Sequence, residues 1–220
     1  MNYTWSYSSI SLFQQCPKKY YRLRVAKDVV EPPRDYLLYG SAVHKVAEDY
    51  VRDGTPIPEK YSFVQQRIDP FVSIEGEKLC EYEMGLTKNM EPCGFRDENV
   101  WFRGIADLLI VNKDKARIID WKTGKSSQYA DKKQLELLSL LVFKHFPQVK
   151  SIKAALVFLV AKDLVPSAYT EDFQYDAWQR WLPELDRLEA AYTTSVWNAK
   201  PNFTCRNFCA VTDCEHNGRR

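Results

Sequence analysis

The sequence predicts an α/β fold in which a central mixed β-sheet is flanked by helices. Two apolar runs separated by a short polar turn, residues 104–111 and 116–124, have the pattern of a hairpin inside a sheet. A helical segment that is apolar nearly all round follows at 129–146, and a further apolar strand segment at 152–161. Strands and helices in this order are typical of a sheet covered by helices.

Composition indicates one ordinary globular domain spanning residues 1–220. The chain is 45% apolar and 27% charged, and its 220 residues are enough for one substantial core. The net charge of +2 does not by itself indicate a nucleic-acid partner. We find no signal-like start and no apolar run long enough to span a bilayer, so we expect a cytoplasmic protein with no membrane partner.

The remaining elements follow from helical periodicity and from helix-breaking residues. Ser8 or Ser9 can cap a first helix, which Pro17 breaks or reshapes. A second helix, 41–53, is expected between Gly40 and Gly54.

The same periodicities predict the elements of the later part of the chain. Residues 57–78 have a weak helical pattern and 78–86 a strand pattern. A long helix is expected at 175–198, with an interruption near Pro183. The last twenty residues show neither period and resemble a tail organised by a ligand.

The hairpin carries two acids in otherwise apolar strands. A turn centred on Lys113 and Asp114 pairs residue i with residue 227 minus i, so Asp107 faces Asp120. Two facing carboxylates repel unless a cation lies between them, and Lys122 returns to the face of Asp120. The alternative is that these acids are surface residues near the strand ends.

Basic residues crowd one stretch near the start of the chain. Lys18, Lys19, Arg22, Arg24 and Lys27 could contact phosphates, or could be a solvated helix face. The sequence favours neither interpretation.

The hairpin resembles the restriction-endonuclease-like core of the PD-(D/E)XK nuclease superfamily. Asp107 and Asp120 would be its two acids and Lys122 its lysine, and Gly104 precedes them, as a glycine often does in this family. The helix that carries His44 and the later pair Gln134-Leu135 are similar to motifs of the RecB-like branch. The resemblance implies a single RecB-like nuclease domain.

The resemblance also implies a metal-dependent mechanism. It assigns His44, Asp107, Asp120 and the backbone carbonyl of Trp121 as ligands of Mg²⁺ or Mn²⁺. Lys122 would orient or activate water, or stabilise the charge that develops on phosphate. The DNA backbone would be held by Gln134 and by the basic residues Lys18, Lys19 and Arg22.

A cysteine pattern at the two ends of the chain carries a second resemblance. Cys16, followed by Pro17, and three cysteines near the C-terminus are similar to the iron-sulfur staple of AddB and of the CRISPR-associated RecB-like exonucleases. This implies that segments 1–25 and 201–218 are joined by a 4Fe-4S cluster on Cys16, Cys205, Cys209 and Cys214. The alternative ligand is Zn²⁺, held by the last three cysteines with Cys16 or His216.

Together these features predict a Mg²⁺- or Mn²⁺-dependent DNA exonuclease that acts on single strands or free DNA ends. Its expected setting is recombination, repair or phage DNA metabolism in a bacterial, archaeal or phage-infected cell, with partner proteins of the recombination, repair or CRISPR type. One alternative is a DNA-end-binding or assembly subunit that keeps the fold and does not cut. Another is a nuclease that acts on RNA.

Overall fold

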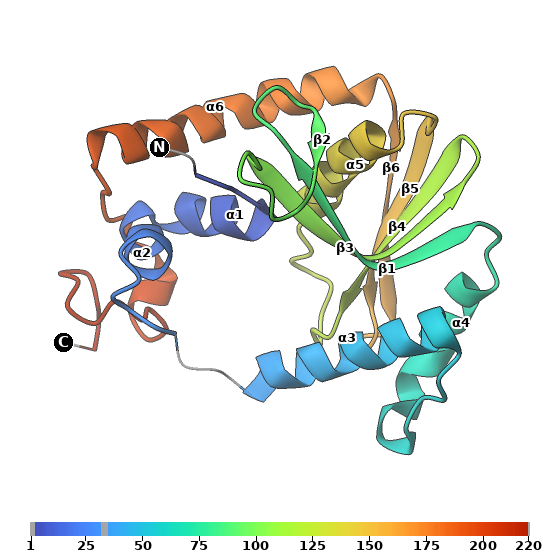
Figure 1. The fold of residues 1–220 in the computed structure, drawn as a ribbon. Helices are drawn as coiled ribbons and strands as arrows, with labels where there is room; N and C mark the ends of the chain where they lie inside the picture. The colour runs from blue at the N-terminus through green and yellow to red at the C-terminus, as the bar shows by residue number, and fades with distance from the viewer. Residues whose placement is uncertain (1–2, 32–34, 220) are drawn as a thin grey trace. The chain divides into compact units, whose positions relative to one another are not determined.

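The structure is a computed structural model that describes residues 3–31 and 35–219 (Figure 1). The chain forms two compact units, one made of residues 3–33 and 176–220 and the other of residues 34–175. Residues 1 and 2 of the expected N-terminal segment lie outside the described part. The described N-terminal and C-terminal segments therefore belong to the first unit, and the predicted hairpin belongs to the second.

The second unit is built on a six-stranded sheet of order β2-β1-β3-β4-β5-β6. The strands are β1 (Glu77–Leu86), β2 (Pro92–Cys93), β3 (Phe102–Asn112), β4 (Lys115–Lys122), β5 (Ser151–Phe158) and β6 (Asp163–Thr170). Only the β4–β5 pairing is parallel among these six strands. The predicted mixed sheet flanked by helices is confirmed.

The β3–β4 hairpin has the register read from the sequence. Leu108 pairs with Ile119 and Leu109 with Ile118, so paired residue numbers add up to 227. Ladder pairing stops at Leu108–Ile119, one step before Asp107 and Asp120. The two acids therefore lie where the strands cease to be hydrogen-bonded as a ladder.

Helices cover the sheet of the second unit. They are α3 (Asp35–Asp53), the 3₁₀ segment η2 (Glu59–Val64), α4 (Gln65–Val72) and α5 (Lys133–His145). Buried residues of α3 and α4, among them Val43, Ala47 and Ile68, pack in one core with Ile119 and Trp121 of β4. Since side chains alternate along a strand, Ile118 and Asp120 point away from that core, and Gln134 of α5 contacts Asp120 there.

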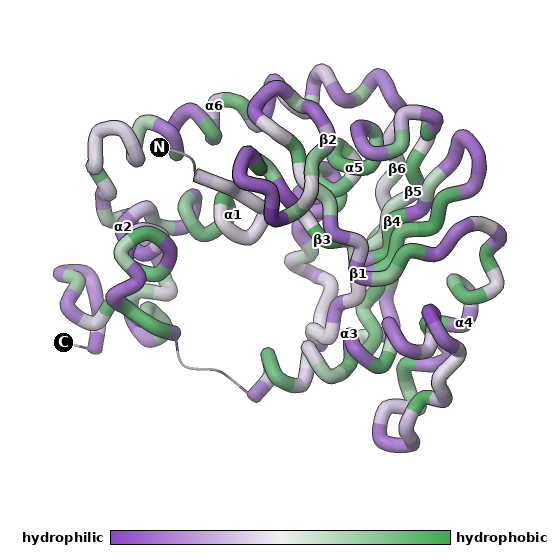
Figure 2. The backbone as a smooth tube through the Cα atoms, viewed as in Figure 1, coloured by the Kyte–Doolittle hydropathy of each residue, from purple (hydrophilic) through white to green (hydrophobic). Residues whose placement is uncertain are grey.

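Helix α5 is the crossover that a parallel β4–β5 pair requires. It approaches β3 closely at Gly104, where a Cβ atom would lie 2.8 Å from Cδ1 of Leu141 and 3.0 Å from Cδ2 of Leu138. A glycine at this strand position thus lets the helix lie against the sheet. In Figure 2 the apolar colour follows the middle strands of the sheet.

Several predicted boundaries were wrong. Helix α3 begins at Asp35, so Gly40 lies inside it and does not precede it. The expected helix at 57–78 is η2 followed by α4, and α5 begins at Lys133 and not at 129. The edge strand β6 was not predicted, because its residues alternate between exposed and half-buried and include Pro166.

The first unit contains α1 (Tyr7–Gln15), α2 (Pro17–Tyr20), the π-helical turn η1 (Tyr21–Val25), most of α6 (Phe173–Thr194) and the 3₁₀ turn η3 (Phe203–Cys205). Ser6, and not Ser8 or Ser9, caps α1. Pro17 ends that helix by starting α2 at its first position, where a missing N–H costs nothing. Helix α6 continues through Pro183, contrary to expectation, with Trp181 and Leu185 buried on either side.

Aromatic rings form much of the core of this unit. Trp197 packs against Phe13, Tyr20, Tyr21 and Tyr192 at centroid distances of 5.0–6.3 Å. The hydroxyl groups of Tyr20 and Tyr192 lie 2.9 Å apart, and burial of Tyr20 raises its pKa above the ordinary value. These contacts join α2 to α6 across most of the sequence.

Within the described residues, no helix has both the length and the hydropathy needed to cross a lipid bilayer.

Candidate metal centre

Five elements of the second unit bring charged and polar side chains to one place. His44 comes from α3, Glu81 from β1, Asp107 from β3, the pair Asp120 and Lys122 from β4, and Gln134 from α5. The strands supply rigid backbone on both sides of the point where β3 and β4 diverge. The site therefore depends on the assembled sheet and on no single motif.

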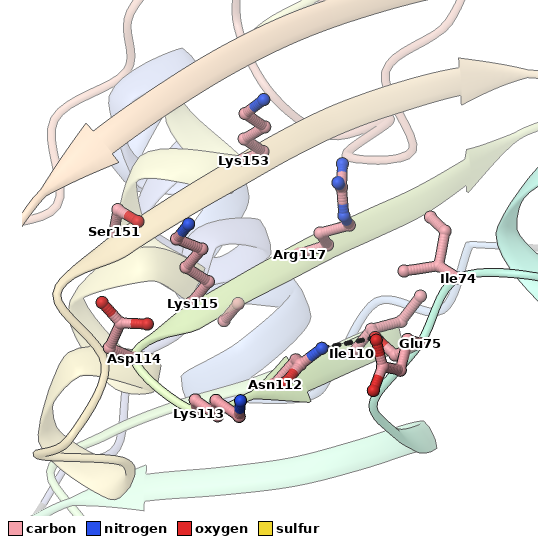
Figure 3. Close-up of a pocket in the computed structure, with 11 residues that line it drawn as sticks. Ile74, Glu75, Ile110, Asn112, Lys113, Asp114, Lys115, Arg117, Ser151 and Lys153 are labelled. Atoms are coloured by element: carbon pink, nitrogen blue, oxygen red, sulfur yellow. Dashed lines mark hydrogen bonds between the residues drawn. The ribbon is translucent and has the colours of Figure 1, made fainter.

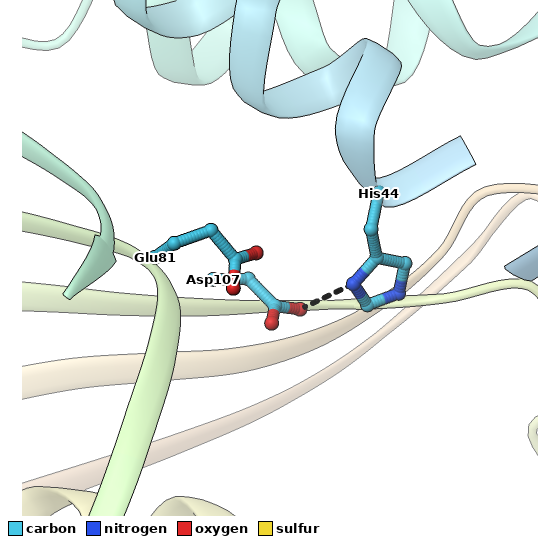
Figure 4. Close-up of side chains that lie close together, drawn as sticks. All are labelled: His44, Glu81 and Asp107. Carbon is cyan, nitrogen blue, oxygen red and sulfur yellow. Dashed lines mark ion pairs between the residues drawn. The ribbon is translucent and has the colours of Figure 1, made fainter. Parts of the chain in front are cut away.

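His44, Glu81 and Asp107 form a group whose ligand-type atoms all lie within 4.8 Å of one another (Figure 4). The Nδ1 atom of His44 lies 3.4 Å from Oδ2 of Asp107. Burial alone would lower the pKa of His44, but the hydrogen bond and charge of Asp107 outweigh it, and the net shift is upward. Among the described residues, these three side chains form the group whose ligand atoms lie close enough together to bind one metal ion.

Asp107 also bridges the gap between the two strands. Its Oδ2 atom accepts a hydrogen bond of 2.7 Å from the backbone N–H of Trp121. A carboxylate thus replaces the carbonyl that the ladder would otherwise supply to this N–H. Trp121 is 2% exposed, and its indole packs edge-on against Phe71.

Asp120 is the most deeply buried acid of the site. It is 2% exposed, and its Oδ1 atom accepts a hydrogen bond of 2.5 Å from Nε2 of Gln134. Its Oδ2 atom lies 2.6 Å from Nζ of Lys122 but has no hydrogen bond of normal geometry. Burial and the negative charge of Asp107 raise the pKa of Asp120 to about 6, against the opposing effect of Lys122.

Lys122 is held from two sides. Besides the ion pair with Asp120, its Nζ atom donates a hydrogen bond of 2.9 Å to Oε1 of Gln134. The amide of Gln134 therefore donates to the acid and accepts from the base, and so fixes both side chains. The structure thus places Lys122 and Gln134 in contact with Asp120, and His44 in contact with Asp107. Asp120, a predicted metal ligand, is not one of the three side chains of the metal-binding group.

Sequence reasoning missed Glu81. Its neighbours Cys80 and Tyr82 pair with Leu108 and Ala106, so Glu81 lies opposite Asp107, but these two residues do not pair. Glu81 takes a left-handed backbone with φ of 50°, which is rare for a residue with a side chain. Burial, and then the charges of Asp107 and Glu48, raise the pKa of Glu81.

Glu48, one turn after His44, is not part of the group. Its Oε1 atom lies 2.5 Å from Nη1 of Arg52, so it forms an ion pair along the helix.

The centre opens into a cavity of about 1070 Å³, which His44, Glu81 and Lys122 line. A second hollow, of about 620 Å³, lies at the turn end of the same hairpin (Figure 3). It is lined by cationic residues such as Lys115, Arg117 and Lys153, and no described metal-binding group of three belongs to it. The acids Glu75 and Asp114 line it as well.

The four cysteines expected to bind a cluster lie around one small cavity of the first unit. A cavity of about 10 Å³ is lined by Cys16, Cys205, Cys209 and Cys214, and His216 also contributes. Backbone N–H groups of Lys19 and Lys200 each lie 3.5 Å from Sγ of Cys16, as does that of Asn202 from Sγ of Cys205. Cys80 and Cys93 lie in the second unit and are half-buried.

The basic residues expected to bind DNA are paired with acids. Lys18 lies 2.6 Å from Glu215, Lys19 lies 2.8 Å from Glu31, and Arg22 lies 2.8 Å from both Asp28 and Asp213. The ion pair with Lys18 lowers the pKa of Glu215 to about 2. A DNA contact by these three residues remains a prediction.

A model of the PD-(D/E)XK nuclease superfamily matches residues 4–214. The solved structure of a protein from Eubacterium rectale, provisionally assigned as an exonuclease, is 12% identical, with a TM-score of 0.57 over 96% of this chain and 86% of that one. The protein SSO0001 is 13% identical, with a TM-score of 0.48 over 98% of this chain and 86% of that one. No curated protein matches the chain. The likeness to the Eubacterium rectale protein is one of fold.

Proposed function

Because this chain belongs to the PD-(D/E)XK nuclease superfamily, whose members are metal-dependent nucleases, we propose that it is a Mg²⁺- or Mn²⁺-dependent exonuclease of the RecB-like branch acting on DNA. One observation carries the proposal. The buried carboxylate of Asp120 lies between the ammonium of Lys122 and the amide of Gln134, beside the group formed by His44, Glu81 and Asp107. These are the acids and the base that the proposed hydrolysis would use.

The side chains of the centre fit a divalent cation. Carboxylate oxygens from Glu81 and Asp107 and a nitrogen from His44 lie within reach of one ion. The buried Oδ2 atom of Asp120 lacks a normal hydrogen bond, so a further acceptor is available beside them. Oxygen-rich sites favour Mg²⁺ and Mn²⁺, and one imidazole shifts the preference toward Mn²⁺.

A bound ion would supply the acidity that water needs for attack and offset the negative charge that builds up on phosphate. The proposed ligands are His44, Glu81, Asp107 and Asp120, and the Trp121 carbonyl is retained from the sequence prediction.

The side chains around Lys122 give it one defined position. The ion pair with Asp120 and the hydrogen bond to Gln134 limit the rotation of this side chain, which lines the cavity. A fixed ammonium in a partly buried site stabilises developing negative charge on a phosphate oxygen and orients water that attacks phosphorus. Gln134 therefore acts mainly by positioning.

The cysteines support an iron-sulfur cluster. We assign a 4Fe-4S cluster to Cys16, Cys205, Cys209 and Cys214, since four thiolates are the usual complement. The four cysteines line one cavity, so their thiolates can meet at one bound group.

The cluster assignment has a direct test. Protein purified without oxygen should be brown and contain about four iron atoms per chain. A colourless protein with one zinc per chain would replace the cluster by a zinc site.

The substrate and setting follow the branch that the motifs resemble. We propose that the enzyme degrades DNA from free or single-stranded ends, in recombination, repair or phage DNA metabolism, together with proteins of those pathways or of the CRISPR type. The alternatives are an RNA substrate and a subunit that binds DNA ends without cutting.

One assay separates these outcomes. Linear DNA labelled at either end, single- and double-stranded, is incubated with Mg²⁺ or Mn²⁺ beside a closed circle and a matched RNA. The wild type should shorten linear DNA, whereas Asp120→Asn and Lys122→Ala should not. Asp114→Asn, an exposed acid in the turn of the same hairpin, is the matched control and should keep full activity.

Full activity in both site variants would remove the proposal. Binding of DNA ends without cleavage in either metal would replace it with the assembly subunit, and cleavage of RNA alone would change the substrate.

A further inference from the structure

The first turns of α3 expose four large apolar side chains in succession. Tyr36 is 60% exposed, Leu37 54%, Leu38 62% and Tyr39 40%. Farther along the same helix, Val43, Ala47 and Val51 are buried in the core. A run of exposed apolar residues of this length on a folded domain is typical of a binding surface.

Three of these four side chains open onto the metal centre. Tyr36, Leu37 and Tyr39 line the same cavity of about 1070 Å³ as His44 and Lys122, whereas Leu38 does not. The cavity thus has a charged end, where a phosphate would react, and an aromatic end.

Helical spacing places the two ends at a defined separation. Tyr36, Gly40 and His44 are four residues apart, so they follow one face of α3 and span about 12 Å along its axis. Gly40 leaves this face open, and a Cβ atom there would lie 3.2 Å from Oγ1 of Thr123. A length of 12 Å corresponds to roughly three to four steps of a nucleic-acid strand at 3.4 Å each.

A cation also lines the same cavity. Lys125 is exposed and forms no ion pair with any described residue, whereas Lys45 on α3 lies 2.7 Å from Asp49. Aromatic faces next to an unpaired cation are the components that proteins use to hold single-stranded nucleic acid, because bases stack on the rings and the cation binds the backbone. A purely apolar docking surface would not need the cation.

We propose that Tyr36 and Tyr39 form a stacking platform for unpaired bases of the strand whose phosphodiester bond lies at the metal centre. This subsite rests on the proposed nuclease function and gives it a preference for single strands. Bases inside a duplex are already stacked and paired, so their ring faces are covered. The platform therefore discriminates by base accessibility and not by sequence.

Binding of fluorescein-labelled 12-nucleotide DNA, followed by anisotropy in EDTA so that no cleavage occurs, tests the platform. The variant carrying Tyr36→Ala and Tyr39→Ala should bind the single strand about 10-fold more weakly than the wild type, as expected for lost base stacking. A 12-mer of abasic residues should bind the wild type and this variant equally, since it has no bases to stack. Tyr36→Phe should keep wild-type affinity, because the ring and not the hydroxyl makes the contact.

Two matched controls separate the platform from general effects. Leu38→Ala removes an equally exposed side chain of the same turn that does not line the cavity, and Tyr175→Ala removes an aromatic ring that is 71% exposed elsewhere in the unit. Both should bind the 12-mer like the wild type, and circular dichroism melting should show that all variants are folded.

Equal affinity of the double variant and the wild type, an equal loss on abasic and normal strands, or no binding by the wild type would each overturn the platform. If the double variant binds DNA as tightly as the wild type while the wild type cleaves linear DNA, the nuclease function stands and only this subsite is removed.

Discussion

Nζ of Lys122 lies 2.6 Å from Oδ2 of Asp120, a residue that is 2% exposed. This ion pair does not lower the pKa of Asp120, because burial and the nearby charge of Asp107 together exceed the effect of the ammonium. Asp120 thus resists ionisation, and a divalent cation bound beside it would reverse this.

The first prediction concerns stability against pH. The pKa of Asp120 is about 6 in the folded protein and 3.8 in its ordinary state, so between about pH 4 and pH 6 the folded protein binds more of this proton than the unfolded chain. The contribution of Asp120 to stability therefore falls as pH rises through this window, by about 3 kcal/mol at most. The free energy of unfolding is measured in EDTA between pH 4 and pH 7 for the wild type and for Asp120→Asn. The difference between the two proteins gives the contribution of Asp120 at each pH.

The comparison with Asp120→Asn is needed because other acids change stability with pH in the opposite direction. Ion pairs lower the pKa values of Asp213 and Glu215, so their contribution is lost as pH falls. Adding Mn²⁺ should abolish the fall attributed to Asp120, and an unchanged difference between the two proteins across the window would contradict the prediction.

The second prediction concerns Gln134. Gln134→Ala removes the amide that orients both Asp120 and Lys122, so metal-dependent turnover should fall about 10- to 100-fold, the usual effect of losing an orienting partner. Gln66→Ala, at an exposed position of α4, should leave turnover unchanged. Steady-state kinetics on linear DNA compare the two, and equal rates would show that the orienting contacts do not matter.

The third prediction concerns Glu81. Glu81→Gln should weaken Mn²⁺ binding about 10-fold in calorimetric titration, because a carboxylate of the His44 and Asp107 group is lost. Glu83→Gln, an exposed residue of the same strand paired with Arg96, should bind Mn²⁺ normally. Wild-type affinity in Glu81→Gln would exclude Glu81 as a ligand.

A second change at the same position separates strain from ligation. Glu81→Gly removes the carboxylate but also relieves the left-handed backbone, which costs a residue with a side chain roughly 1–2 kcal/mol. Its melting temperature should exceed that of Glu81→Gln while its Mn²⁺ affinity stays low. The reverse order of melting temperatures would mean that the backbone at this position is not strained.

The fourth prediction concerns the cysteine cavity. Cys209→Ser should lower the melting temperature by about 10 °C or more through loss of the proposed cluster, since ligand binding and folding are coupled. Cys93→Ser, a half-buried cysteine of β2, should shift it by about 2 °C or less and keep the iron content. Equal melting temperatures for both variants would argue against a structural ligand.

Local pairing explains why the hairpin could be predicted. The register of Leu108 with Ile119 depends on one short turn and on alternation along two adjacent strands, and both are visible in the sequence. The position of Glu81 opposite Asp107 depends instead on pairing β1 with β3 across a long connection and on an unusual backbone angle. Neither has a local signal.

Helix boundaries failed for related reasons. Gly40 is a common terminator, but here it allows close contact with Thr123, and the helix continues on both sides of it. Pro183 is tolerated within α6, where its neighbours Trp181 and Leu185 are buried, because packing outweighs the loss of one hydrogen bond. Local preference predicts a helix end or interruption at both residues, whereas tertiary contacts keep the two helices continuous.

The chain order of the two units has a consequence for synthesis on the ribosome. Residues 34–175, which include the hairpin and every side chain of the metal centre, are inserted between the two halves of the other unit. All of this segment is available once Tyr175 has been made, whereas the cysteine cavity needs the chain as far as Cys214. Since domains fold as units during translation, the six-stranded sheet can form before synthesis of the cysteine-bearing unit is complete.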